Sequence, residues 1–296
     1  MMQQIDTPDA LIAARKTMTG KVGLVPTMGA LHAGHLALVE AARRENDHVI
    51  VTIFVNPAQF GVGEDLTTYP RPLMEDLAHL RALDVDVVFT PTASGIYPPR
   101  YQTHLDVEIL SMGLEGAARP GHFRGVATVV AKLFNLAQPT TAYFGQKDAQ
   151  QILVIRQMIR DLHMPVEIAI CPTVREADGL AMSSRNRNLA PNERQAANVL
   201  FRSLFAAAEA YDSGERQPVA FRETALHVLR SEPMAQVDYV AICNPRTLFG
   251  VHDAIHDPAL MLLAVKIGAV RLLDNALLPW SSNERAGLLA NLGASL

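Results

Sequence analysis

Cysteine is scarce in this chain, which has only two among its 296 residues, and the scarcity excludes several kinds of site. Cys171 and Cys243 each lie within an apolar run that is typical of a strand. We therefore predict that both are free thiols buried in the core, in preference to a disulfide or a cysteine nucleophile. With so few cysteines, the chain also lacks the ligand spacing of a cysteine-based zinc site.

Long apolar runs and blocks of positive charge are missing as well. A transmembrane helix needs about 20 apolar residues, whereas the best candidate, residues 260 to 273, is short and is broken by Lys266 and Arg271. Residues 1 to 16 lack the basic start and apolar core of a signal peptide. The net charge is −4, which argues against a nucleic-acid partner but not against small anionic ligands. We expect a soluble, cytoplasmic protein with no nucleic-acid or membrane partner.

Hydrophobic residues make up 49% of the chain, enough to bury a sizeable core. Short apolar runs of the kind found in buried parallel strands alternate with helical patterns. We expect strands at residues 22–25, 49–55, 85–90, 141–144 and 166–172, and helices at residues 31–44, 73–83, 125–137 and 149–162. This alternation predicts an α/β fold whose ligands bind at the carboxyl ends of parallel strands.

The pattern changes after Asn188. A long helix is expected from about Pro191 to Tyr211 and a second at residues 219–229. Strand patterns follow at residues 237–243, 260–265 and 269–274. We therefore predict two domains: a catalytic α/β domain at residues 1–186 and a smaller α+β domain at residues 187–296.

The most informative segment is Val-Pro-Thr-Met-Gly-Ala-Leu-His-Ala-Gly-His at residues 25–35, which joins a buried strand to a helix. Gly29 and Gly34 let a ligand approach the backbone, and the N–H groups of a helix's first turn attract phosphate. His32 and His35 are three residues apart, so they share a helix face and can both point toward that phosphate. A structural helix start and half of a zinc site are the alternatives. We expect ATP to bind here.

Amide and charged side chains also follow two other expected strands, those at residues 49–55 and 141–144. Asn56 and Gln59 suit a neutral hydroxyl or a carboxylate, although an Asn-Pro turn would also explain Asn56. Lys147 suits phosphate oxygens and Asp148 suits a ribose hydroxyl, whereas the alternative is a surface ion pair.

The loop at residues 175–186 carries two adjacent hydroxyls and a guanidinium, from Ser183, Ser184 and Arg185, that can hold several phosphate oxygens together. Such loops are also commonly just solvated. His122 and Arg124 could face an anion, or could merely cap a helix at the surface. The sequence has no Walker-type Gly-x4-Gly-Lys-Ser/Thr loop.

Taken together, these segments resemble the pantothenate synthetase, or pantoate–β-alanine ligase, family. The resemblance covers nearly the full length and rests on six motifs: Pro-Thr-Met-Gly-Ala-Leu-His-x-Gly-His (26–35), Phe-Val-Asn-Pro-x-Gln-Phe (54–60), Tyr-Pro-Arg (69–71), Arg-Pro-Gly-His-Phe-Arg-Gly-Val (119–126), Phe-Gly-x-Lys-Asp-x-Gln-Gln (144–151) and Ser-Ser-Arg-Asn (183–186). The His pair is similar to the His-x-Gly-His signature of the nucleotidyltransferase superfamily. The resemblance implies a Rossmann-like sheet and a lid formed by the C-terminal domain.

The resemblance also implies an AMP-forming ligation in two halves. Pantoate carboxylate would attack the α-phosphorus of ATP, giving pantoyl adenylate and pyrophosphate. The amine of β-alanine would then attack the acyl carbon, releasing AMP and pantothenate. No enzyme nucleophile is required, so catalysis would consist of positioning and charge stabilisation. An adenylyltransferase that keeps AMP on its product and a catalytically silent nucleotide-binding protein are the alternatives.

Residue roles are carried over by matching position. The resemblance implies catalytic roles for His35, as proton donor, and for His32, Lys147 and Arg185. The ATP-binding residues would be Met28, Gly29, Ala30, Leu31, His32, Ala33, Gly34, His35, Gly145, Gln146, Lys147, Asp148, Val174, Met182, Ser183, Ser184 and Arg185. Pantoate would be held by Asn56, Gln59 and Gln151, with Gln59 also meeting β-alanine.

Other expectations concern the metal, the assembly and one departure from the family. Mg²⁺ would accompany ATP, with an acidic residue such as Asp76 as a candidate helper and no separate protein metal site. A homodimer is expected from the family alone. Gln146 stands where many members carry Glu, which alters only the local charge.

Overall fold

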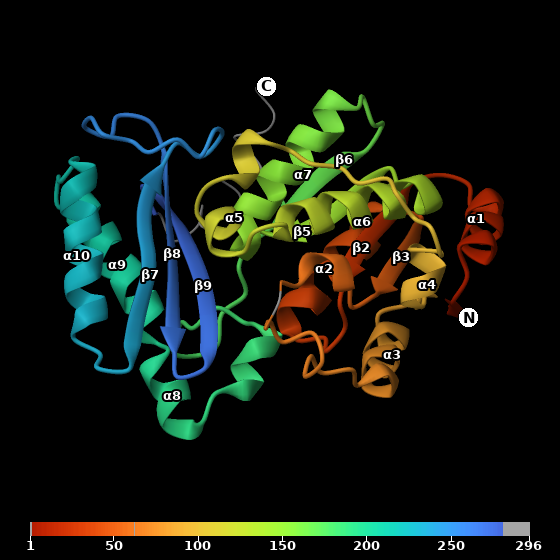
Figure 1. The fold of residues 1–296 in the computed structure, drawn as a ribbon, viewed down its shortest axis with the longest axis horizontal. Coiled ribbons are helices and arrows are strands. Elements are labelled where there is room, and N and C mark those ends of the chain that lie inside the picture. Colours follow the sequence, from red (N-terminus) through yellow and green to blue (C-terminus); the bar gives the residue numbers. More distant parts are fainter. Residues whose placement is uncertain (1, 62, 281–296) are drawn as a thin grey trace. The chain divides into compact units, whose positions relative to one another are not determined.

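The computed structural model describes residues 2 to 61 and 63 to 280, and the chain divides into two compact units (Figure 1). One unit contains the described residues up to Gly145 together with Gln150–Cys171. The other contains Gln146–Ala149 and the described residues from Pro172 onward. Compact units need not coincide with domains that fold alone, so the domain boundary after residue 186 stays a prediction.

The first unit is built on a parallel sheet. Its six strands lie in the order β1 (Gln3–Ile5), β4 (Val87–Phe89), β3 (His48–Ile53), β2 (Val22–Thr27), β5 (Thr141–Gly145) and β6 (Glu167–Cys171). The central strands are apolar because both faces are covered, and Leu24 and Val25 expose no surface. The strand order reverses between β2 and β5, whose carboxyl ends mark the point at which open α/β sheets bind ligands. The predicted parallel, Rossmann-like sheet is confirmed.

Helices connect these strands. They are α1 (Pro8–Thr17), α2 (Ala33–Glu45), α3 (Leu73–Ala82), α4 (Ala93–Ile96), α5 (Glu115–Ala118), α6 (His122–Ala137) and α7 (Ala149–Asp161), with short 3-10 turns η1 (Pro57–Gln59), η2 (Ile109–Ser111) and η3 (Gln146–Asp148). Leu38 of α2 and Leu77 of α3 belong to one buried cluster with Val25 and Val51 of the sheet. Leu24 and Ile50, which lie next to those strand residues, point to the opposite face.

The sequence reasoning missed β1 and α1 at the beginning of the described chain. Two of the three β1 residues are exposed, so this edge strand has no apolar run. Helix α1 has a recognisable start, because Thr7 accepts a hydrogen bond from the Ala10 N–H at 3.3 Å and Pro8 follows. These local signals were available in the sequence but do not form a strong hydrophobic pattern.

The second unit combines helices with an antiparallel sheet, which confirms the predicted α+β pattern. Its elements are η4 (Ser184–Asn188), α8 (Pro191–Ala196), α9 (Val199–Asp212), α10 (Pro218–Arg230), β7 (Ala235–Cys243), β8 (Ala259–Ile267) and β9 (Val270–Leu278). Leu204, Phe221 and Leu263 form part of its core. The single helix expected from Pro191 to Tyr211 is two helices, separated at residues 197 and 198, where the Asn198 side chain donates to the Asp178 carbonyl.

Within the described ranges, no helix is long and apolar enough to cross a membrane. Cys171 and Cys243 are buried and unpaired, as predicted. Burial raises the pKa of each thiol to about 11. At neutral pH both therefore stay protonated, which makes them poor nucleophiles.

Candidate functional site

The loop after β2 is held in place by a buried carboxylate. Asp76 is 1% exposed, and its two oxygens accept hydrogen bonds from the N–H groups of Ala30 at 2.9 Å and Leu31 at 2.8 Å. Gly29 has φ of +81°, and a Cβ there would lie 3.0 Å from an Asp76 oxygen. Both carboxylate oxygens thus serve the loop backbone. Asp76 therefore positions this loop, and the metal-helper role considered from the sequence stays a prediction.

This anchoring places the start of α2 two residues later than expected. The predicted start at Leu31 is wrong, because the Leu31 N–H is bound by a carboxylate and the helix begins at Ala33. His32 becomes the N-cap residue, with extended backbone dihedrals.

The two histidines form the cap of α2 together. His32 Nδ1 accepts a hydrogen bond from the Gly34 N–H at 3.2 Å, and His35 Nδ1 accepts one from the His32 N–H at 3.4 Å. Their ring centroids are 4.0 Å apart. Because Nδ1 is an acceptor in both rings, the proton of each neutral imidazole resides on Nε2. The cap therefore fixes two adjacent Nε2–H donors at the carboxyl end of a central strand.

Gln59 is oriented by a chain of polar contacts. Tyr97 Oη donates to Asn56 Oδ1 at 2.8 Å, and Asn56 Nδ2 in turn donates to Gln59 Oε1 at 2.9 Å. The Gln59 amide nitrogen is then directed toward Met28, with Nε2 and Sδ 3.2 Å apart. Asn56 also caps η1 by accepting from the Ala58 N–H at 3.3 Å. The amide pair and the Asn-Pro turn, posed as alternatives in the sequence, are thus both present, and Tyr97 is a residue that sequence reasoning missed.

The backbone of Gln59 is fixed by a second set of residues. The His122 Nδ1–H donates to the Gln59 carbonyl at 2.8 Å, and Arg119 Nη2 donates to the same oxygen at 3.4 Å. Arg119 also forms two hydrogen bonds with the Glu64 carboxylate, at 2.8 and 2.5 Å, and this contact lowers the pKa of Glu64. His122 is buried whereas Arg124 is exposed, so only His122 faces the interior. The sequence alone could not show which of the two side chains is buried.

His122 is neutral in this arrangement. Burial, followed by the neighbouring Arg119 guanidinium, lowers the pKa of His122 from 6.5 to about 4. The neutral ring accepts at Nε2 from Arg119 Nη1 at 3.1 Å while it donates at Nδ1. Protonation would remove that acceptor and place two cations side by side.

Acid should therefore weaken the fold through His122. Because the folded-state pKa lies below the unfolded one, the unfolded chain binds more protons between pH 6.5 and about 4, and stability falls as the pH falls through that window. The stabilisation is present well above pH 6.5, and about 2 kcal/mol of it is lost by pH 5. Urea unfolding at about pH 7.5 and pH 5 should show this loss in the wild type and not in His122→Asn, which cannot titrate. Equal losses in the two proteins would contradict the assignment.

Two adjacent glutamines follow β5, and the structure separates their roles. Gln150 is 3% exposed, and its side-chain nitrogen donates to the carbonyls of Leu110 and Gly113, both at 2.9 Å. Gln150 is therefore committed to holding the segment before α6. Gln151, the predicted pantoate residue, is half-buried in the first turn of α7, just beyond the end of β5 at Gly145.

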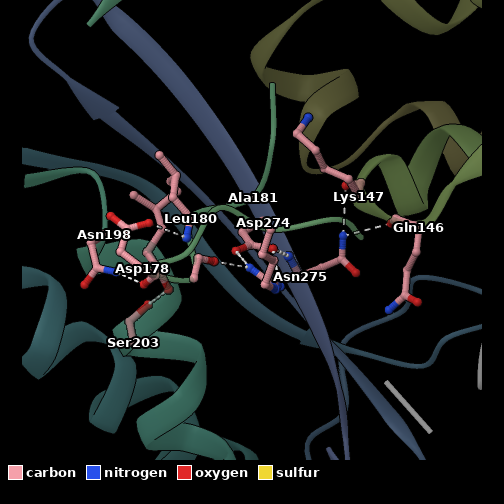
Figure 2. A network of polar contacts seen from close by, with 12 residues as sticks. Gln146, Lys147, Asp178, Leu180, Ala181, Asn198, Ser203, Asp274 and Asn275 are labelled. Atoms are coloured by element: carbon pink, nitrogen blue, oxygen red, sulfur yellow. Dashed lines mark hydrogen bonds and ion pairs between the residues drawn. The ribbon is translucent and has the colours of Figure 1, made fainter. Parts of the chain in front are cut away.

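In the second unit, η3 carries the predicted phosphate cation. The Lys147 Nζ lies 3.4 Å from Asp148 Oδ1, so the predicted surface ion pair is present in a loose form. The Lys147 ammonium points away from Asn275, which holds the backbone of this turn (Figure 2). Gln146 is 5% exposed, so a neutral amide there avoids the cost of burying a carboxylate.

The segment from Val174 to Met182 is a short hairpin. The Met182 N–H donates to the Val174 carbonyl at 2.9 Å, and Arg175 bridges Ala181 in antiparallel fashion. Val174 and Met182, both predicted to bind ATP, are thus neighbours. Gly179, with φ of +94°, forms the turn.

The loop beyond Met182 is ordered by local contacts. The Ser183 hydroxyl accepts from the Arg185 N–H at 3.3 Å and begins η4, and Ser184 is 8% exposed. Asn186 donates to a Glu176 oxygen at 2.7 Å, so the hairpin and η4 are joined. The predicted phosphate loop is therefore a structured turn and not a solvated coil.

Carboxylates that could hold a metal are sparse. The described part of the chain contains no group of three or more His, Cys, Asp or Glu side chains suited to a metal ion.

Comparisons with known proteins show which family this chain resembles. A profile of the pantoate-beta-alanine ligase family matches residues 1–277. The chain is 58% identical over 277 residues to pantothenate synthetase from Roseiflexus castenholzii, covering 94% of this chain and 99% of that protein. It is 48% identical over 277 residues to the enzyme from Acetivibrio thermocellus, covering 94% and 98%.

Solved structures show the same likeness. A crystal structure of pantothenate synthetase from Thermus thermophilus superposes with a TM-score of 0.89 at 49% identity, covering 93% of this chain and 98% of that one. That of pantoate-beta-alanine ligase from Francisella tularensis, complexed with beta-gamma ATP and beta-alanine, gives 0.78 at 35% identity, covering 94% and 98%. With these matches spanning nearly the whole sequence, the chain belongs to the pantoate–β-alanine ligase family.

Proposed function

We propose that this ligase works through pantoyl adenylate. The overall reaction is the ATP-dependent ligation of pantoate with β-alanine. In the first half, a pantoate carboxylate oxygen bonds to the α-phosphorus and the bond to pyrophosphate breaks. In the second half, the amine of β-alanine bonds to the acyl carbon, loses a proton and expels AMP.

The paired histidines act on the phosphates in this scheme. His35 and His32 present Nε2–H donors because backbone N–H groups occupy Nδ1 in both rings. Donors fixed before the reaction stabilise charge that develops on the phosphate oxygens without having to reorganise. His35 assists departure of pyrophosphate by hydrogen bonding or proton donation. Lys147 and Arg185 neutralise the same negative charge from their own segments.

Pantoate is held by the oriented amides. Gln59 offers its Nε2 donor, since Asn56 occupies Oε1, and an amide donor suits a hydroxyl or carboxylate. Gln151 supplies a second amide, and Gln59 also meets β-alanine. The remaining ATP-binding residues are those of the loop from Met28 to Gly34, the turn from Gly145 to Asp148, the hairpin with Val174 and Met182, and the adjacent Ser183 and Ser184.

Mg²⁺ enters as part of the MgATP substrate, bridging its phosphates. We also propose a homodimer that acts in the cytoplasm. The homodimer and the cytoplasmic location both follow from the sequence-based expectations. Gel filtration with light scattering tests the first, and cell fractionation tests the second.

One observation supports the proposal most strongly. The tautomers of His32 and His35 are set by the helix cap, so both rings are prepared as donors before any ligand binds. The rings are tilted by 34° with centroids 4.0 Å apart, so the two Nε2–H donors lie side by side.

The proposal is tested by measuring AMP and pantothenate together. With ATP and pantoate alone, we expect at most one equivalent of pyrophosphate per enzyme, and sustained AMP release only when β-alanine is added. AMP release that does not depend on β-alanine would contradict the ligase. An adenylated product that accumulates in solution would favour an adenylyltransferase instead.

A further inference from the structure

Two adjacent polar residues on β9 are buried in the second unit. Asp274 and Asn275 are each 2% exposed. Successive residues of a strand point to opposite faces, so these two side chains serve different segments. The residues that alternate in step with Asp274 are apolar and belong to the core, namely Val270, Leu272, Ala276 and Leu278. A carboxylate in that row is costly unless it is paired.

The partner of Asp274 is Arg175. The two carboxylate oxygens accept from Arg175 Nη1 at 2.6 Å and Nη2 at 3.0 Å, which is a bidentate pair. Arg175 Nη1 also donates to the Gly179 carbonyl at 2.9 Å. This one guanidinium therefore ties the strand to the turn of the hairpin.

The rest of the Arg175 environment holds it rigidly. Its guanidinium carbon lies 5.2 Å from the centre of the Phe201 ring and 5.5 Å from that of Trp280. Arg175 pairs with Ala181 across the hairpin, and Met182 follows immediately. Fixing Arg175 thus fixes the point from which the chain enters the Ser183–Arg185 turn.

Asn275 binds a different segment, the η3 turn at Gln146–Asp148. Its Nδ2 donates to the carbonyls of Gln146 at 3.0 Å and Lys147 at 2.8 Å (Figure 2). A single amide therefore holds two successive carbonyls of η3. With those carbonyls held, the Lys147 side chain starts from a defined backbone position.

We propose that Asp274 and Asn275 are positioning residues for the ATP phosphates. Asn275 acts through the backbone of Lys147, and Asp274 acts through Arg175 on the segment that ends in Arg185. Because the two are adjacent on one strand, they hold both phosphate-binding segments in a fixed relation within this unit. The inference rests on the proposed function, since it takes Lys147 and Arg185 as phosphate ligands.

The first test replaces Asn275 by Asp, which keeps the shape but removes the amide donor. Two carbonyls then face a carboxylate oxygen, and we expect the KM for ATP to rise at least tenfold while the KM for pantoate stays within twofold. The control is Asn244→Asp, which makes the same substitution at an exposed position of the same unit. Asn244 Oδ1 accepts from the N–H groups of Arg246 and Thr247, and a carboxylate retains that acceptor role.

Asp274→Asn tests the other half. It leaves Arg175 with a neutral partner, and we expect a similar rise in the KM for ATP.

Asn275→Ser is the milder substitution at position 275. It keeps one hydroxyl donor, and its KM for ATP should lie between those of Asn275→Asp and the wild type. Dissociation constants for a non-hydrolysable ATP analogue, measured by calorimetry, should rise in the same order as the KM values.

The outcomes separate positioning from general support. A lower melting temperature with unchanged ATP affinity and unchanged KM values, measured well below that temperature, would overturn the inference. Equal increases in KM for ATP and pantoate would overturn it too, because the whole protein would then have loosened. A wild-type protein that makes no pantothenate would instead contradict the proposed function.

Discussion

Replacing His35 by alanine should lower kcat by about 100-fold or more. The Nε2–H of this ring is the donor we assign to the developing charge during pyrophosphate departure. Its Nδ1 accepts from the His32 N–H, so alanine also removes part of the helix cap. The loss of activity must therefore be separated from the loss of the cap.

His35→Asn makes this separation. The asparagine Oδ1 can accept the hydrogen bond from the His32 backbone that Nδ1 accepts in the wild type, whereas no group replaces Nε2–H. We expect His35→Asn to melt close to the wild type and still lose most of the activity. His79→Ala, at an exposed position of α3, is the control for loss of a histidine. Full activity in His35→Asn would remove His35 from the mechanism.

Replacing Lys147 by methionine should be nearly as damaging, with a fall in kcat/KM for ATP of about 100-fold. Methionine keeps an unbranched side chain but carries no charge, so phosphate neutralisation is lost while packing is largely kept. The backbone of residue 147 should stay in place, because Asn275 binds its carbonyl and not its side chain.

The control for Lys147 is Lys266→Met, which removes an exposed lysine from β8 of the same unit. Lys147→Arg should recover part of the activity, since the charge returns with different geometry. Steady-state kinetics at saturating pantoate and β-alanine would measure these effects. An unchanged KM for ATP and unchanged kcat in Lys147→Met would show that the 3.4 Å contact with Asp148 is only a surface pair.

The parallel sheet could be predicted from the sequence because its strands are buried on both faces. Runs such as residues 22–25 are apolar throughout, and their short length and alternation with helical patterns favour buried parallel strands. The edge strand β1 is mostly exposed, so the same reasoning overlooked it.

The start of α2 could not be placed correctly from the sequence. Local patterns favoured Leu31, but the carboxylate that binds its N–H lies 45 positions away, on α3. A long-range contact therefore decided a local boundary. The same contact shows that Asp76 binds the loop backbone, which the sequence alone did not indicate.

The sequence singles out candidate site residues but does not identify the residues that support them. His32, His35, Gln59 and Lys147 stand out because reactive side chains follow strands. Asp274 looks in sequence like a polar interruption of a strand, and its partner Arg175 is 99 positions away. Such support is defined by tertiary packing, and periodicity carries no information about it.

The central claim is that pantoate carboxylate attacks the α-phosphorus, and an isotope measurement tests it directly. Pantoate labelled with heavy oxygen in both carboxylate positions is converted to pantothenate, and the AMP and pyrophosphate are analysed by mass spectrometry. Attack at the α-phosphorus leaves one carboxylate oxygen bonded to that phosphorus, so AMP should carry one heavy oxygen and pyrophosphate none. Unlabelled AMP, or label in pyrophosphate, would contradict the account.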